Sequence, residues 1–202
     1  LSVIDNDDNP FTAIRAQQLI IEFASDYNYS MATFCTGSDQ RWGVHYYIGD
    51  NTKTVFKGFI VMDDISEPLL APTEIVTLTA TDNLGLLKDI PLTNTDETTL
   101  RGKYKIIDIL SKCFAKTGMD LEIRVAFNIK LSGMEDDISV QNTTDEHFFS
   151  NVYLDSLTFE DELLTLENCY LIVEKIIGNE ATAFQMKGQW WIMRIDEVEH
   201  PT

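Results

Sequence analysis

The sequence lacks the patterns that mark membrane, nucleotide-binding and serine-hydrolase proteins. No apolar run approaches the roughly 20 residues that a membrane-spanning helix needs. The phosphate-binding patterns GxxxxGKS/T and GxGxxG are missing, and so is the nucleophile pattern GxSxG. The first ten residues show neither the basic nor the apolar segment of a signal peptide, so we expect none. Because the chain begins with Leu1 and not with Met, we expect it to be a piece of a longer protein.

Cysteine is scarce. Cys35, Cys113 and Cys169 are odd in number, far apart in the chain and outside any CxxC pattern. This usage predicts neither a disulfide framework nor a zinc site. Cys113 and Cys169 fall on the apolar faces of predicted helices, where a thiol behaves as a small hydrophobic group. We therefore expect the chain to fold in a reducing cytoplasm.

Basic residues are also few. Lys and Arg number 15 against 33 Asp and Glu, which gives a formal net charge of −18. So acidic a surface repels phosphate, which argues against sequence-specific nucleic-acid binding and against an anionic membrane partner. Two interpretations of the acidity stay open: a well-solvated surface, or the wall of a channel that must not bind DNA.

Strand patterns dominate the first half of the chain. Alternating apolar residues predict the strands of this half, and a cluster of turn-forming residues predicts the connection within one hairpin. They are Leu19–Ala24, a hairpin of Trp42–Ile48 and Thr54–Met62 around Gly49–Asn51, and Glu74–Thr81. Asp82 is expected to cap a short helix at Leu84–Lys88.

Helical spacing begins after the polar stretch Thr93–Thr99, so we place a boundary near residue 98 between a strand-rich domain, 1–97, and an α+β domain with two helices, 98–202. Apolar spacing predicts one helix around Ile106–Phe114, ended by Gly118, and a second at Cys169–Ile177, ended by Gly178. The predicted fold class is α+β. Its N-terminal half is strand-rich, with hairpins or a barrel-like sheet, and its C-terminal half packs helix–strand units on a sheet. The strands expected there are Leu121–Ile129 and a hairpin of Thr182–Met186 and Gln189–Ile195 around Lys187-Gly188.

Candidate catalytic residues do not group into a recognisable motif. The three histidines, His45, His147 and His200, do not stand beside a Ser or Cys in a nucleophile pattern. Neighbouring carboxylates could serve a glycosidase, but in a chain with 33 acids some adjacency arises by chance. The adjacent acids are Asp63-Asp64, Asp136-Asp137 and Glu160-Asp161-Glu162.

Two further patterns favour structural interpretations. The run Asp5–Asn9 resembles the start of a calcium loop, but Pro10 and Ala16 stand where that loop needs Gly and Glu. Trp190-Trp191 could stack on a sugar, yet adjacent strand residues point to opposite faces, so packing is the favoured role. The sequence therefore predicts no catalytic, cofactor-binding or metal-binding residues, and no cofactor.

Several phrases in one order resemble a family of large tail structural proteins of phages and prophages from Bacteroidetes. The resemblance covers nearly the whole chain and rests on packing and turn motifs. The phrases are Asn9–Ala16, Lys57–Ile60, Ser66–Pro72, Val76–Asp89, Ile109–Cys113 with Thr117-Gly118, Cys169-Tyr170 and Gln189–Ile195.

The resemblance implies a non-enzymatic virion component, made in the host cytoplasm and located at the tail hub, baseplate or tail tip. Its expected partners are other tail proteins and copies of itself, with a trimeric ring as one arrangement. Two other functions stay open. One is a carbohydrate- or receptor-binding module that uses Trp42, Trp190 or Trp191, and the other is a tail-associated hydrolase that uses an acidic pair.

Overall fold

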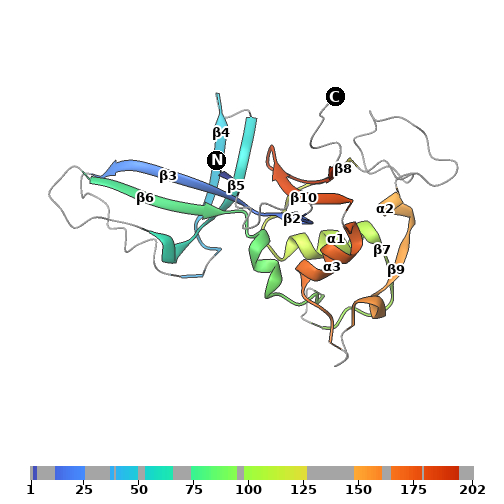
Figure 1. Ribbon diagram of the computed structural model, residues 1–202. Helices are drawn as coiled ribbons and strands as arrows, with labels where there is room; N and C mark the ends of the chain where they lie inside the picture. Colours follow the sequence, from blue (N-terminus) through green and yellow to red (C-terminus); the bar gives the residue numbers. More distant parts are fainter. Residues whose placement is uncertain are drawn as a thin grey trace.

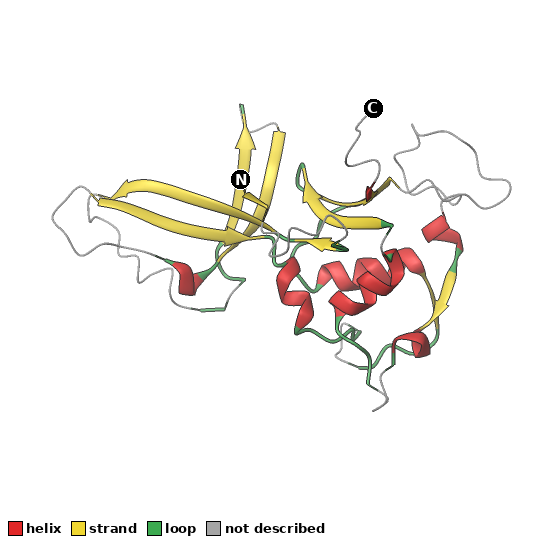
Figure 2. Ribbon diagram, viewed as in Figure 1, coloured by secondary structure: helices red, strands yellow, loops and turns green. Residues whose placement is uncertain are grey.

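The computed structural model of the chain describes residues 2–3, 12–25, 37–38, 40–49, 53–65, 74–94, 98–126, 148–160, 165–178 and 180–195. Figure 1 shows two connected parts: a sheet whose strands extend to one side, and a body in which helices pack against a second sheet. Figure 2 shows that the main helices belong to the body. The fold is α+β and strand-rich in its N-terminal half, as predicted.

The first sheet, which we call the arm sheet, has five strands in the order β1-β3-β6-β5-β4. All its pairings are antiparallel. Its strands confirm the predicted hairpin and the two predicted strands that pair as β3 and β6. The bounds are β1 Ser2–Val3, β3 Gln17–Ser25, β4 Gly43–Ile48, β5 Lys53–Ile60 and β6 Glu74–Thr81.

The strands β3 and β6 form a long two-stranded ribbon. They pair from Gln18↔Thr81 to Ser25↔Glu74, whereas β5 pairs with β6 only at Phe59 and Ile60. The far end of the ribbon therefore leaves the rest of the sheet, and Figure 1 shows it pointing away from the body. A short 3-10 helix, η2 (Met62–Asp64), follows β5.

The second sheet, the body sheet, has four strands in the order β2-β10-β11-β8. The hairpin β10–β11 is as predicted, and its turn residues Lys187 and Gly188 have φ of 54° and 69°, the left-handed pair that a tight hairpin needs. The sequence did not indicate that β2 would pair in parallel with β10, or β8 with β11. The bounds are β2 Ile14–Arg15, β8 Ile123–Ala126, β10 Ala181–Met186 and β11 Gln189–Arg194.

The helices of the body cover this sheet. The predicted helices are α1 (Ile106–Ala115) and α3 (Cys169–Ile177), which pack on each other. Gly118, with φ of 82°, takes the left-handed conformation expected after α1. The irregular stretch after 147 forms short elements. These are α2 Phe148–Asn151, β9 Tyr153–Asp155, which pairs with β7 Lys103–Lys105, and the 3-10 helix η4 Ser156–Phe159.

One large core holds the body together. The indole of Trp190 stacks on Phe114, with ring centroids 5.5 Å apart, and both side chains are buried. The core also takes side chains from residues 13–14 and from 84–100, where the 3-10 helix η3 (Leu84–Lys88) lies. It thus draws on both sides of residue 98, and the predicted division there stays a prediction.

Candidate assembly surface

Exposed apolar side chains gather on the arm sheet. Nine large hydrophobic side chains are exposed among the described residues, and five of them belong to this sheet. Ile75, at 63%, is the most exposed of the nine. A monomeric protein exposes such side chains singly without consequence, whereas several on the same face of a sheet are typical of an interaction site. The five are Ile20, Phe23, Tyr46, Ile48 and Ile75.

The register explains why some of these side chains face solvent. In an antiparallel pair, opposite residues share a face. Ile21↔Leu78 and Phe23↔Val76 therefore lie on one face of the ribbon, and that face packs against Trp42 and neighbouring side chains. Ile20 and Ile75 lie on the other face, where they are 51% and 63% exposed.

Both lateral edges of the arm sheet are open within the described part of the chain. On its outer side, β3 pairs with β1 only at Gln17 and Gln18. On the opposite edge, β4 has β5 as its one strand neighbour among the described residues. An open edge presents backbone N–H and C=O groups that can pair with another strand.

The β4–β5 hairpin is basic, in contrast to the rest of the chain. Residues 40–60 contain the basic residues Arg41, Lys53 and Lys57 and a single acid, Asp50 in the turn, so the hairpin carries a net charge of +2 (3 − 1) while the whole chain carries −18. Arg41 and Lys53 are exposed. The hairpin is therefore complementary in charge to an acidic surface such as that of a second copy.

A buried glutamine fixes the arm sheet to the body sheet. The side chain of Gln185, on β10, donates from Nε2 to the carbonyl of Lys57 (2.8 Å). Its Oε1 accepts from the N–H of the same residue (2.7 Å). The Gln185 amide thus makes the pair of hydrogen bonds that a neighbouring strand would make with the backbone of β5, and it joins the two sheets at Lys57.

A glycine allows β5 to cross β6 where the hairpin leaves the ribbon. A Cβ atom on Gly58 would lie 2.3 Å from the carbonyl oxygen of Thr81 and 2.7 Å from the ring of Phe56. Any other residue would have to push the strands apart, so this crossing requires glycine.

A buried carboxyl holds the other end of the junction. Asp82 follows β6 and is fully buried. Its Oδ2 accepts from the N–H of Gln17 (2.9 Å) and its Oδ1 from the N–H of Leu84 (3.2 Å). The N-cap residue of η3 is Asn83, and not Asp82 as predicted, but the Asp82 carboxyl still accepts from the first N–H of η3. The next residue, Asn83, donates from its side chain to the carbonyl of Thr117 (3.1 Å), just after α1. Asp82 and Asn83 therefore link the ribbon to the helices of the body.

Burial raises the pKa of the Asp82 carboxyl to about 7, and the N–H groups of Leu84 and Gln17 limit the rise. A carboxyl with such a pKa in a cleft is a candidate for acid–base catalysis. Here its hydrogen-bond partners are backbone N–H groups of the junction itself, so we interpret Asp82 as a structural link.

The structure separates the candidate residues that the sequence singled out. His45 lies on β4, exposed, with Nδ1 3.2 Å from the hydroxyl of Tyr47. Asp63 and Asp64 lie exposed in η2, on the arm sheet side of the molecule. The other candidates fall outside the described residues: His147, His200, Asp5–Asn9, Asp136-Asp137 and Asp161-Glu162.

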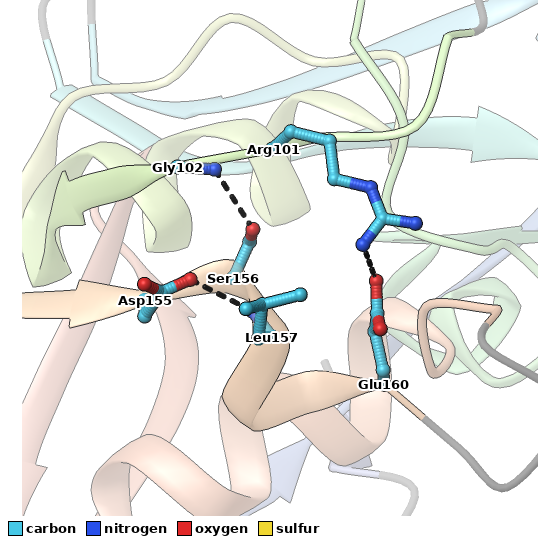
Figure 3. A network of polar contacts seen from close by, with 6 residues as sticks. All are labelled: Arg101, Gly102, Asp155, Ser156, Leu157 and Glu160. Carbon is cyan, nitrogen blue, oxygen red and sulfur yellow. Dashed lines mark hydrogen bonds and ion pairs between the residues drawn. The ribbon is translucent and has the colours of Figure 1, made fainter.

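Glu160, from the third acidic group, has a structural role. It forms an ion pair with Arg101, and Figure 3 shows this pair beside a second contact between the same two chain segments, from Gly102 to Ser156. Ser156 Oγ accepts from the N–H of Gly102 (3.1 Å). These contacts fasten η4 to the strand β7.

The tryptophans divide between core and surface. Trp190 is in the core, as the favoured interpretation predicted, so it cannot form a sugar platform. Trp191 is half-buried and donates from its ring nitrogen to the carbonyl of Met186 (3.1 Å). Trp42 is half-buried, and the Arg41 guanidinium lies 5.2 Å from its ring centroid.

Within the described ranges, no group of three or more His, Cys, Asp or Glu side chains is arranged to hold a metal ion. No helix in that part of the chain is long and apolar enough to cross a membrane. Sequence reasoning missed the role of Gln185, which stands in a strand pattern as an ordinary polar residue.

No protein-family model and no curated protein matches the chain. Among solved structures, the chain is similar to the 43 kDa tail protein of prophage MuSo2 from Shewanella oneidensis, with 12% sequence identity and a TM-score of 0.46. The match covers 91% of this chain and 47% of that protein, so the chain spans about half the length of the protein it matches. At this identity and TM-score, the function of the chain rests on its own residues.

Proposed function

We propose that this chain is a structural component of a phage tail, a module of the hub, baseplate or tail tip, and that it assembles through its arm sheet. The observations that carry the proposal are the two edges of the arm sheet that are open among the described residues, and the exposed Ile20 and Ile75, which share the outer face of the ribbon. The order of packing motifs in the sequence supports the tail assignment, since those motifs resemble tail structural proteins.

The arm sheet offers what strand-to-strand assembly requires. Most of β3 has a free outer edge among the described residues, and β4 forms the opposite edge. Two different edges on one molecule allow head-to-tail contacts, which close into rings when the rotation permits. The hairpin at one edge has a net charge of +2, and β3 at the other edge has a single charged residue, Glu22, so the two edges differ in sign.

The acidity of the chain is compatible with a position along a DNA path. Each Lys or Arg that contacts phosphate adds affinity by releasing counterions. With a net charge of −18, the protein lets DNA pass without holding it.

The test is the oligomeric state of the purified chain and of two matched variants. Light scattering after size exclusion, over a range of concentrations, should show self-association that grows with concentration. Ile75→Lys places a charge on the exposed ribbon face and should abolish it. Leu157→Lys is the control, because Leu157 is similarly exposed, at 56% against 63%, but lies on η4 in the body.

A monodisperse monomer at every concentration would count against assembly through the arm sheet. Equal loss of association in Ile75→Lys and Leu157→Lys would show that the effect comes from added charge and not from the arm sheet. Circular dichroism of each variant verifies that the fold is intact.

A binding module is the second candidate, and the half-buried Trp42 beside Arg41 is the observation that favours it. A glycan array separates the two functions. Tight binding of one glycan, lost in Trp42→Ala, would support the binding module. A tail-associated hydrolase ranks third, since no contact among the described residues unites two of the proposed acidic groups.

A further inference from the structure

The β4 edge of the arm sheet presents the backbone groups of its odd-numbered residues. The N–H of Ile60, in β5, donates to the carbonyl of Trp42 (2.9 Å), so the even-numbered residues of this strand direct their backbone groups toward β5. Successive residues of a strand alternate in this direction, and the odd-numbered residues of β4 therefore direct their N–H and C=O groups outward. These residues are Gly43, His45 and Tyr47.

The β3 edge presents the backbone groups of its even-numbered residues. Gln17 directs both of its backbone groups toward the end of β6. Its N–H donates to Oδ2 of Asp82 (2.9 Å), and its carbonyl accepts from the N–H of Asp82 (3.2 Å). The even-numbered residues of β3 therefore direct their backbone groups outward. The strand β1 reaches along this edge only as far as Gln18. The outward residues beyond it are Ile20, Glu22 and Ala24.

Strand direction determines how the two edges can meet. Every pairing in the arm sheet is antiparallel, in the order β3-β6-β5-β4, so β3 and β4 run in opposite directions along the sheet. A rotation that places a second copy at the end of this sheet keeps the direction of its β3. The β3 strand of the second copy then lies antiparallel to β4 of the first copy, and the sheet continues from one molecule into the next.

We propose that the partner of the arm sheet is a second copy of this chain, whose Leu19–Ala24 pairs antiparallel with Gly43–Ile48 of the first copy. This inference rests on the proposed function and specifies its contact. The register uses the whole length of β4 and brings outward residues of one edge opposite outward residues of the other. The three pairs that exchange hydrogen bonds are Ile20–Tyr47, Glu22–His45 and Ala24–Gly43.

The same register brings opposite charges together. His45 lies opposite Lys57 within the hairpin, on the face of the sheet that carries Ile20 and Glu22 in β3. Glu22 of the second copy therefore lies beside His45 and Lys57 of the first copy. Glu22 is the one charged residue of β3, and the hairpin has a net charge of +2. The two edges consequently attract each other.

Apolar side chains meet on both faces of the continued sheet. On the face that packs against Trp42, Ile21 of the second copy lies opposite Tyr46, which is 42% exposed. On the other face Ile20, which is 51% exposed, lies opposite Tyr47. The pairing therefore removes apolar surface from water while it satisfies the backbone groups of both edges.

Pairing of two like edges is disfavoured by charge. A two-fold pairing of β3 with β3 that uses its three outward residues places Glu22 directly opposite Glu22. A two-fold pairing of β4 with β4 brings two hairpins of charge +2 together. Like charges that lie directly opposite in a sheet destabilise the pair. The head-to-tail contact of β4 with β3 avoids both arrangements.

Cross-linking between two variants of the full chain tests the register. One variant carries Glu22→Cys and the other carries His45→Cys and an affinity tag, both in a Cys35→Ser background, and both replaced side chains are exposed. Opposite residues of a hydrogen-bonded pair have Cα atoms about 5.5 Å apart, within the range of about 4.4–6.8 Å that a disulfide spans. Mild oxidation of the mixture should give dimers with one chain of each kind, which return to monomers on reduction.

The control is a mixture of Ala24→Cys with His45→Cys. Ala24 is exposed and on the same face as Glu22, but it lies diagonally from His45, about 7–8 Å away. Its disulfide should therefore form much more slowly. A second matched mixture, Ile20→Cys with Tyr47→Cys, should cross-link as the first does. Circular dichroism of each variant verifies that it is folded.

Equal rates of cross-linking in the matched and diagonal mixtures would overturn the register. Dimers of two Glu22→Cys chains or of two His45→Cys chains, in place of mixed dimers, would overturn the head-to-tail contact. A chain that self-associates, loses association in Ile75→Lys and forms no mixed disulfide contradicts this inference alone. A chain that stays monomeric at every concentration and forms no disulfide contradicts the proposed assembly and this inference with it.

Discussion

Replacing Asp82 by Asn is expected to flatten the dependence of stability on pH. The carboxyl of Asp82 is fully buried between the ribbon and the body, and burial raises its pKa from 3.8 to about 7. The folded state therefore binds this proton more tightly than the unfolded state does. The stability that the protonated carboxyl contributes is fully present below pH 3.8 and is lost as the pH rises through about 7.

The size of the effect follows from the pKa. Each pKa unit corresponds to about 1.4 kcal/mol. The rise from 3.8 to about 7 thus makes the free energy of unfolding about 4 kcal/mol larger in acid than above neutral pH, as far as Asp82 alone is concerned. Asn stays neutral at every pH, so the variant loses this dependence. It also loses one of the two backbone hydrogen bonds, which lowers stability by about 1–2 kcal/mol at all pH values.

Urea unfolding at a series of pH values between about 4 and 8 measures the effect. The fluorescence of the buried Trp190 reports the transition. The quantity of interest is the difference in unfolding free energy between wild type and Asp82→Asn, because the other acidic groups cancel in it. The control is Asp89→Asn, which removes the same charge from an exposed residue just after η3.

Parallel plots of unfolding free energy against pH for wild type and Asp82→Asn would refute the reasoning about Asp82. If wild type and Asp82→Asn differ by a constant amount over this range, the carboxyl titrates alike in the folded and unfolded states. The same conclusion follows if Asp89→Asn flattens the curve as much as Asp82→Asn.

Two further predictions concern the junction between arm sheet and body. Gln185→Leu leaves the N–H and carbonyl of Lys57 without their side-chain partner, so urea unfolding should show a loss of about 2–4 kcal/mol. A loss below about 0.5 kcal/mol would mean that water replaces the amide at no cost. Gly58→Ala brings a Cβ within 2.3 Å of the Thr81 carbonyl oxygen and should cost about 1–3 kcal/mol. Gly43→Ala, where a Cβ meets nothing within 4 Å, is the control and should change stability by less than about 0.5 kcal/mol.

Local patterns predicted most of the elements. The spacing of Ile106, Leu110 and Cys113 gave α1 because one helical face must be apolar to enter a core. The alternation in Glu74–Thr81 gave β6, since Val76 and Leu78 point inward on a pleated strand. Such signals depend only on neighbouring residues, so one sequence suffices to read them.

The contacts that join distant segments could not be predicted in this way. The pairing of β2 with β10 connects Ile14 to Ala183, and two residues are too short for an alternating pattern. Gln185 looks like any polar strand residue until Lys57 is seen beside it. Cys113 and Cys169 are far apart in the sequence, whereas the packing of α1 on α3 brings both into one core.

The position of β2 has a consequence for biosynthesis. The body sheet places residues near the start of the chain directly beside β10 and β11. The ribosome must therefore have synthesised the chain through β11, which ends at Arg194, before this sheet can close, whereas β3 to β6 have all been made by residue 81. During this interval the arm sheet, with Ile20 and Ile75 exposed and its edges open among the described residues, can pair with a neighbouring growing chain before the body sheet has formed.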